Sequence, residues 1–402
     1  MKYAHLFAML VAMLLMAVAL IAGQTYAEAL ENRYVHALAP IHATLTYEGS
    51  ALTRAALQQP DLLPVFGGSE ALSQRSQYQA SSFFSKYPTG FETFEVAQAG
   101  GASLLTAEVI AALGPAVRGK HIVITFTPAN FAVRQANSTY YAGLLSSLHA
   151  YELAFNVQLS FDTRQAAAKR MLQYSDTLQK DQLLRFALQH LASGSPFDHL
   201  IYGLSWPLGR LQMWILELQD HFQTASFILS HPELNPDVTR QAMTIDWSRL
   251  AAQARQEQTQ YSNNNPYGFD NQVWLQQFAS RFKFRSYGSG DQNYLANLKN
   301  SAEWTDLDIL LSTLTELGAH PLLLGRPISR AYYEAIGVSS TAQQAFYARM
   351  HQIASRYDVP VVDFANFGGD KFFVTDSASH TSREGWVYVD QVLDEFFHGT
   401  LH

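Results

Sequence analysis

Apolar and polar positions divide the chain into an N-terminal apolar run, two groups of short strands and a long helical middle part. The run Leu6–Gly23 is uninterrupted and approaches the roughly 20 residues that a helix needs to cross a bilayer. Lys2 precedes it. Because positive charge is retained on the cytoplasmic side, this pattern predicts an anchor whose following residues lie outside the cytoplasm.

A cleaved signal peptide is the alternative, since Thr25–Ala27 resembles a small-residue cleavage site. The apolar run exceeds the usual signal-peptide core, which favours an uncleaved anchor over residues 1–27. Residues 28–402 then form one extracytoplasmic catalytic domain. Within it, Arg33–Pro60 is expected to be a polar segment next to the membrane.

Short apolar and β-branched runs predict strands in both halves of the chain. The expected strands are Leu62–Phe66, Phe91–Val96, His121–Thr127, Pro321–Leu324 and Val359–Val362. Helical patterns alternate with them and end with Trp386–Phe397, which predicts an α/β fold with a doubly wound parallel sheet. The residues from about 131 to 300 show long helical segments and are interpreted as a helical insertion.

Polar and glycine residues follow three neighbouring strand candidates. Ser69 follows the first strand, Gly100 and Gly101 follow the second, and Asn130 follows the third. In doubly wound sheets, ligands bind at the carboxyl ends of the strands. We therefore expect these residues to meet at one edge of the sheet.

Composition excludes several classes of function. The 27 basic and 34 acidic residues give a net charge of −7, and no basic run is present to bind nucleic acid. The chain has no cysteine, which excludes disulfides, thiolate metal sites and cysteine nucleophiles. The histidines lack metal-ligand spacing such as H-E-x-x-H, so we expect neither a metal nor another cofactor.

Ser69, His380 and Asp376 have the side chains that nucleophilic acyl transfer requires. A serine hydroxyl is a weak nucleophile and needs a base, usually histidine, which is itself oriented by a carboxylate. Asp376 and His380 would share one face if their segment formed a helical turn. Their distance from Ser69 along the chain means that only the fold can bring the three together.

An oxyanion hole is the third requirement, and backbone N–H groups and amide side chains usually form it. The N–H of Ser69, an N–H of Gly100 or Gly101 and the side chain of Asn130 are the candidates. Their order along the chain, followed by Asp376 and His380 before a final helix, resembles the block order of the SGNH hydrolase superfamily.

Several motifs resemble one branch of that superfamily, the D-alanyl transfer proteins called DltD. They are Phe66-Gly67-Gly68-Ser69-Glu70, Gln98–Leu104, Gly119-Lys120-His121 with Thr127-Pro128, Asn264-Asn265 with Tyr267-Gly268, Ser301–Leu307, Arg326-Pro327, and Asp376–Trp386 ahead of Phe396-Phe397. The similarity covers nearly the whole chain, the anchor included.

This resemblance implies an SGNH-like enzyme, anchored in the membrane, that attaches D-alanine to a cell-envelope polymer such as teichoic acid or a related polysaccharide. Ser69 would carry the D-alanyl group as an ester, and His380 would act as base and then as acid. The implied partners are a membrane-bound O-acyltransferase (DltB-like) and, indirectly, an acyl carrier protein (DltC-like).

The sequence departs from the family pattern at the catalytic acid. Three residues separate Asp376 from His380, whereas the family usually has two, so Asp363 or Asp370 is an alternative orienting acid. Glu70 is either a helix-start carboxylate or a partner for the D-alanyl ammonium. Arg326 is a candidate for binding polymer phosphate.

Two other functions remain compatible with the sequence. The first is another SGNH activity, either an O-acetyltransferase of an exopolysaccharide or an esterase, because transfer requires that water is excluded from the acyl-enzyme. The second is a non-catalytic anchored subunit that binds polymer or a partner protein, whose function would survive replacement of Ser69.

Overall fold

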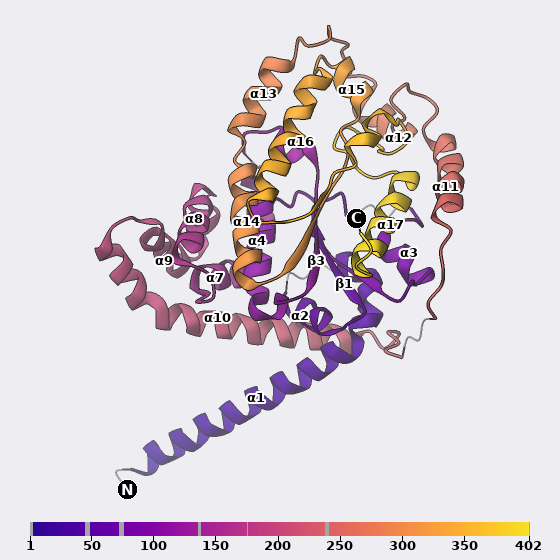
Figure 1. The fold of residues 1–402 in the computed structure, drawn as a ribbon. Helices are drawn as coiled ribbons and strands as arrows, with labels where there is room; N and C mark the ends of the chain where they lie inside the picture. Colours follow the sequence, from indigo (N-terminus) through magenta and orange to yellow (C-terminus); the bar gives the residue numbers. More distant parts are fainter. Residues whose placement is uncertain are drawn as a thin grey trace.

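The computed structural model describes residues 3–44, 49–71, 76–135, 138–174, 176–237 and 241–401. A five-stranded parallel sheet lies at the centre, in the order β2-β1-β3-β4-β5 (Figure 1). The strands are β1 (Leu62–Gly67), β2 (Glu92–Ala97), β3 (His121–Phe126), β4 (His320–Gly325) and β5 (Val361–Val362). The predicted α/β fold with a parallel sheet is confirmed.

The helices alternate with these strands and extend well beyond the sheet. The longer ones are α1 (Ala4–Leu38), α2 (Ala51–Gln58), α3 (Ala80–Lys86), α4 (Ser103–Leu113), α6 (Ser138–Leu144), α7 (Ser147–Phe155), α8 (Phe161–Met171), α9 (Gln182–Ala192), α10 (Pro196–Ser230), α11 (Trp247–Tyr261), α13 (Asp291–Asn300), α14 (Glu303–Leu317), α15 (Arg330–Ala335), α16 (Ser340–Ser355) and α17 (Arg383–Phe397). Two shorter ones are α5 (Pro128–Phe131) and α12 (Asn271–Val273).

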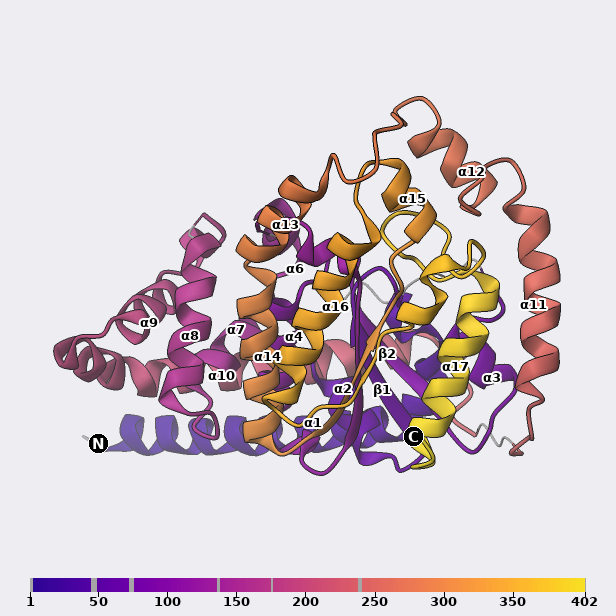
Figure 2. The same cartoon turned by 45° about the horizontal axis from the view of Figure 1, so that its top comes forward.

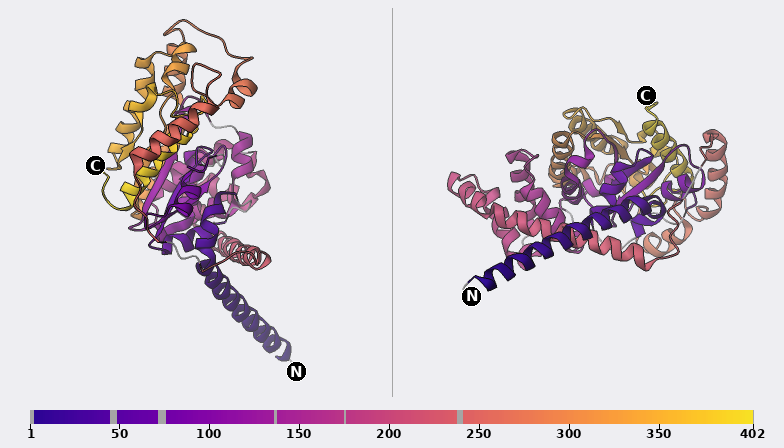
Figure 3. Two further views of the ribbon diagram at one scale, coloured as in Figure 1. Left: turned by 90° about the vertical axis from the view of Figure 1, so that its right-hand side faces the viewer. Right: turned by 90° about the horizontal axis from the view of Figure 1, so that it is seen from below.

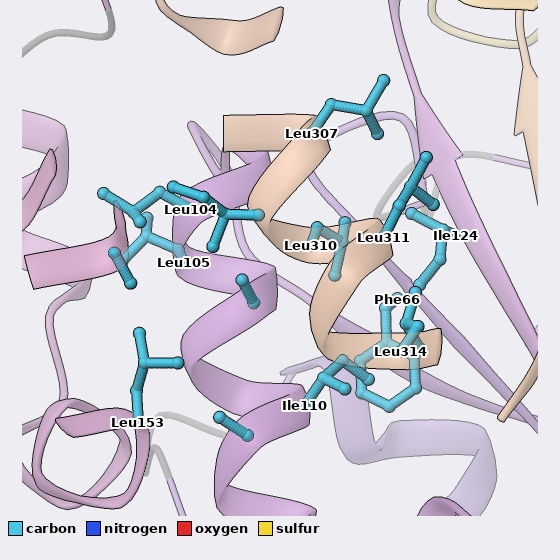
Figure 4. Packing of buried hydrophobic residues seen from close by; sticks show 14 of the residues in the cluster. Phe66, Leu104, Leu105, Ile110, Ile124, Leu153, Leu307, Leu310, Leu311 and Leu314 are labelled. Atoms are coloured by element: carbon cyan, nitrogen blue, oxygen red, sulfur yellow. The ribbon is translucent and has the colours of Figure 1, made fainter. Parts of the chain in front are cut away.

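Successive strand residues face opposite sides of the sheet, as a pleated strand requires. On β3, Ile122 and Ile124 pack into one core and Val123 packs into the other. Helices α4, α14 and α16 cover the first face, whereas α3 and α17, with α11 outside them, cover the second (Figures 1 and 2). Figure 4 shows the first core, where α4 and α14 pack together over Phe66 and Ile124. Both faces are therefore buried, which explains the continuous apolar runs that predicted the strands.

Between β3 and α14, the described part of the chain contains only helices. Helices α7 to α10 pack beside α4, and α11 packs against α17 on the other side of the sheet (Figure 2). An ion pair between Arg170 on α8 and Asp306 on α14 joins these helices to the central layers, with Nε–Oδ1 and Nη2–Oδ2 distances of 2.6 and 2.8 Å.

The N-terminal helix is longer than the apolar run that predicted it. Helix α1 is the one candidate for a membrane span among the described residues. Its first part is exposed, whereas Ala27, Val35 and Leu38 are buried against the rest of the protein. Figure 3 shows α1 leaving the body beside α10.

The expectation of a polar segment over Arg33–Pro60 is wrong. The described residues of this range, 33–44 and 49–60, include the end of α1, a 3₁₀ helix (Ala39–Thr44) and α2, and Leu52 and Ala56 are buried in a third core. The carboxylate of Asp220 on α10 accepts hydrogen bonds from the N–H groups of Ser50 and Ala51 at the start of α2.

Candidate active site

The strand order reverses between β1 and β3, because the chain leaves β1 for β2 on one side and later returns to β3 on the other. Ligands of doubly wound folds bind at such a switch point, outside the carboxyl ends of the strands. Gly68 and Ser69 follow β1 directly, and Asn130 lies on α5 directly after β3. These residues therefore lie at the same edge of the sheet, as the sequence predicted.

Ser69, His380 and Asp376 form a continuous hydrogen-bonded chain. The distance from Ser69 Oγ to His380 Nε2 is 2.8 Å, and that from His380 Nδ1 to Asp376 Oδ2 is 2.6 Å. With Nδ1 protonated and donating to the carboxylate, Nε2 is free to accept the serine proton. All three side chains are at least partly buried. This is the arrangement that activates a serine for attack on a carbonyl.

A tight turn, and not the expected helical turn, brings Asp376 and His380 together. An antiparallel bridge between Val374 and Thr381 closes the base of this turn. Oδ1 of Asp376 accepts hydrogen bonds from the N–H groups of Ala378 and His380, at 2.9 and 3.2 Å, and Ser379 has a φ of +63°. The carboxylate thus holds both the backbone and the imidazole, while its second oxygen remains directed at Nδ1.

The other two candidate acids are engaged elsewhere. Asp363 lies 2.8 Å from His351 Nε2, and Asp370 accepts from Arg255 at 2.6 Å. Burial lowers the pKa of His380, but the hydrogen bond and charge of Asp376, together with the charge of Glu70, outweigh it, so the pKa of His380 is raised. Asp376 is therefore the carboxylate that orients His380 and raises its pKa.

The side chain of Glu70 joins the turn that carries Ser69 to strand β3. Glu70 lies in a turn, and the next described helix, α3, starts at Ala80; residues 72–75 lie outside the described part of the chain, so the helix-start interpretation stays a prediction. Its Oε1 accepts from Gly68 N–H and from the Thr125 hydroxyl, both at 2.8 Å. A Cβ on Gly67 would lie only 1.9 Å from Thr125 Oγ1. Glycine is needed here because the turn packs directly on β3.

The oxyanion candidates differ in how free their donors are. The N–H of Gly101 donates to Gln98 O at 2.8 Å, whereas the described part of the chain offers Gly100 N–H no acceptor. Asn130 Nδ2 lies 3.5 Å from Gly101 O. The Asn130 amide is therefore next to the Gly101 loop and makes only a long hydrogen bond there. Among the described residues, the candidate donors without a short hydrogen bond are thus Ser69 N–H, Gly100 N–H and Asn130 Nδ2.

Arg326 is buried behind the site and has no exposed surface (0%). Its Nε donates to Thr381 Oγ1 at 2.6 Å, next to His380. Burial lowers the pKa of Arg326 to about 10, against the opposing charges of Glu70, Asp390 and Glu95. A polymer phosphate cannot reach a guanidinium in this position, so the structure does not support the expected contact of Arg326 with substrate.

Sequence reasoning missed two buried acids whose charges act on Arg326. Asp390 and Glu95 are almost fully buried, and burial raises the pKa of both carboxyls, that of Glu95 to about 7. Glu95 lies on β2 and Asp390 on α17, so nothing in the local pattern distinguished them from surface acids.

Most of the chain matches one family of known proteins. A family model described as DltD protein matches residues 42–398, which is most of the chain. The chain belongs to the DltD family. Protein DltD of Bacillus subtilis (strain 168) is 26% identical over 351 residues, covering 87% of this chain and 86% of that protein.

Protein DltD of Staphylococcus aureus (strain NCTC 8325 / PS 47) is a second relative, 22% identical over 339 residues, which cover 84% of this chain and 81% of that protein. The family resemblance that the motifs predicted is therefore confirmed, although the family match does not include the predicted anchor. Because the match begins at residue 42, it includes all the strands and every residue of the candidate site.

Proposed function

We propose that this DltD-family protein is a serine acyltransferase that moves D-alanyl groups onto a cell-envelope polymer outside the cytoplasmic membrane. The observation that carries the proposal is the chain from Ser69 through His380 to Asp376, with distances of 2.8 and 2.6 Å. The family membership supplies the D-alanyl group as the expected acyl group, and teichoic acid or a related polysaccharide as the expected acceptor.

The first half of the reaction forms an acyl-enzyme. Ser69 Oγ attacks the carbonyl carbon of the D-alanyl donor while His380 Nε2 takes the hydroxyl proton. Gly100 N–H, Ser69 N–H and Asn130 Nδ2 donate to the negative oxygen of the tetrahedral intermediate. The bond to the leaving group then breaks, and His380 returns the proton to that group.

The second half reverses these roles. A polymer hydroxyl enters, His380 Nε2 accepts its proton, and the oxygen attacks the ester carbonyl on Ser69. Collapse of the second intermediate gives the proton back to Ser69 Oγ and leaves the D-alanyl ester on the polymer. Asp376 remains ionised throughout, and it stabilises the imidazolium that forms in each half.

Helix α1 is proposed to anchor the enzyme in the membrane, with the sheet outside the cytoplasm. A DltB-like membrane O-acyltransferase would supply the acyl group there, after a DltC-like carrier had delivered it on the cytoplasmic side. Each D-alanyl ester adds one ammonium beside the polymer's anions, so the envelope becomes less negative.

The test is the D-alanyl ester content of the envelope in a deletion strain. The strain is complemented with the wild type, Ser69→Ala or the control Ser355→Ala, whose hydroxyl is exposed on α16. We expect esters with the wild type and the control, and none with Ser69→Ala at equal membrane levels. Normal esters with Ser69→Ala would instead indicate a non-catalytic subunit, and unchanged esters in the deletion strain would exclude D-alanylation.

A further inference from the structure

Helix α10 exposes a continuous apolar stripe along one side. Its eight large side chains are 37–71% exposed: Phe197, Leu200, Leu204, Leu208, Leu211, Ile215, Phe222 and Leu229. With 3.6 residues per turn and a rise of 1.5 Å, they fall within an arc of about 80° and extend over about 48 Å. Soluble proteins rarely leave so long an apolar stripe in water.

The stripe lies next to the point where α1 leaves the body. A Cβ on Gly23 of α1 would lie 2.9 Å from the ring of Phe222, and His221 Nδ1 contacts Glu31 Oε1 at 2.8 Å. From this junction, α10 and the exposed half of α1 extend on the same side of the body (Figures 1 and 2). An α1 that crosses the bilayer therefore holds α10 close to the lipid surface.

The remainder of α10 suits a helix that lies between protein and lipid. Tyr202 and Met213 are buried in the helical insertion, so the side away from the stripe is covered by protein. Trp214, which is 42% exposed, borders the stripe. Tryptophan is enriched where apolar and polar regions of a membrane meet.

We propose that this stripe of α10 inserts into the outer surface of the phospholipid bilayer, as a second membrane contact beside α1. The inference requires that α1 spans the membrane, as in the proposed function. Interfacial helices bury their apolar side by about 5–10 Å. A single tether lets the body rotate above the membrane, whereas two contacts fix its orientation and hence the direction in which the Ser69 edge faces.

Depth-dependent fluorescence quenching in vesicles tests the proposal with the full chain. The protein has no cysteine, so single-cysteine variants carry one label each. Leu204→Cys and Leu208→Cys probe the stripe, Leu14→Cys probes α1, and Gln256→Cys probes an exposed site on α11. Phosphatidylcholine vesicles with a nitroxide near the headgroup end of the acyl chain supply the quencher.

We expect labels at Leu204 and Leu208 to be quenched severalfold more strongly than the label at Gln256. Quenching at Leu14 but not at either stripe position would overturn the proposal while leaving the membrane span intact. Quenching at none of the three would overturn the span as well. Labels at Leu204 and Leu208 that become shielded only after a membrane protein is added would assign the stripe to that protein, and the lipid proposal would be wrong.

Discussion

Two pairs of a carboxylate and a basic side chain in this molecule have the same length but different surroundings. Asp376 and His380 at the site, and Asp306 and Arg170 between α14 and α8, each approach to 2.6 Å. The side chains of the second pair are 1% and 5% exposed, whereas those of the first are 12% and 28% exposed. Both pairs are short, but only the first is partly exposed, and its His380 Nε2 also contacts Ser69 Oγ.

The difference shows how one kind of contact can serve chemistry or structure. Arg170 cannot lose its proton in a protein, and Asp306 receives both of its forked hydrogen bonds, so that pair is fixed. His380 exchanges its proton near neutral pH, and its Nε2 remains directed at a nucleophile. We therefore expect substitutions in the first pair to change the rate and those in the second to change stability.

The largest effect is expected for Asp376→Asn. The amide would hold His380 in the wrong tautomer, so the acylation rate should fall by about 10⁴ while the fold is kept. The measurement is the release of p-nitrophenol from a p-nitrophenyl ester by purified protein, with thermal unfolding followed in parallel. Asp363→Asn is the matched control, because Asp363 pairs with His351 and not with His380.

A fall of less than tenfold for Asp376→Asn, or an equal fall for Asp363→Asn, would contradict the assigned orientation. An Asp376→Asn protein that unfolds at a much lower temperature would show that the first pair also has a structural role, and the contrast between the two pairs would disappear.

The reverse result is expected for Asp306→Asn. Removing one partner of a buried ion pair costs about 3–5 kcal/mol, because the other charge remains buried and unpaired. Asp308→Asn is the matched control on the same helix, since its pair with Arg356 is exposed and should contribute about 0–1 kcal/mol. Urea unfolding measures both, and the rate per folded molecule should remain that of the wild type.

A double variant sharpens this comparison. Arg170→Met with Asp306→Leu removes both charges, and such replacements are often neutral or stabilising. We therefore expect it to recover most of the loss. If Asp306→Asn were no less stable than Asp308→Asn, the buried pair would not contribute to holding α8 on α14.

The two pairs also differ in how far they could be predicted from sequence. Strand and helix patterns predicted the sheet. The order of motifs along the chain predicted Ser69, His380 and Asp376, because each lies in a short stretch that resembles a family motif, although Ser69 and His380 are 311 positions apart. The pair of Arg170 and Asp306 joins residues 136 positions apart. Asp306 lies in the motif Ser301–Leu307, but nothing local to either residue indicates the other as its partner. The same reason hid the acids around Arg326, which only packing brings together.

The smallest expected effect is on the pH dependence of the acylation rate, and substitutions in the two pairs should differ in this effect as well. Burial lowers the pKa of His380, but Asp376 raises it by more, so the pKa is above its usual value. The base must be neutral, so the acylation rate should fall about tenfold per pH unit below that raised pKa. The stability contributed by protonated His380 has the opposite sign: it is present at low pH and is lost as the pH rises through the folded-state pKa.

The acidic limb of the pH–rate profile is the low-pH range in which the rate falls. Its position distinguishes the two pairs most directly. In Asp376→Asn the negative charge that raises the pKa of His380 most is gone, while the burial that lowers this pKa remains. The pH below which the residual activity falls should therefore move to a lower value. In Asp306→Asn the surroundings of His380 are unchanged, and the limb should stay where it is in the wild type. Rate profiles of the p-nitrophenyl ester reaction measure both. A limb that moves in Asp306→Asn would mean that the structural pair acts on the charge of the site after all, through the packing that joins α14 to the sheet.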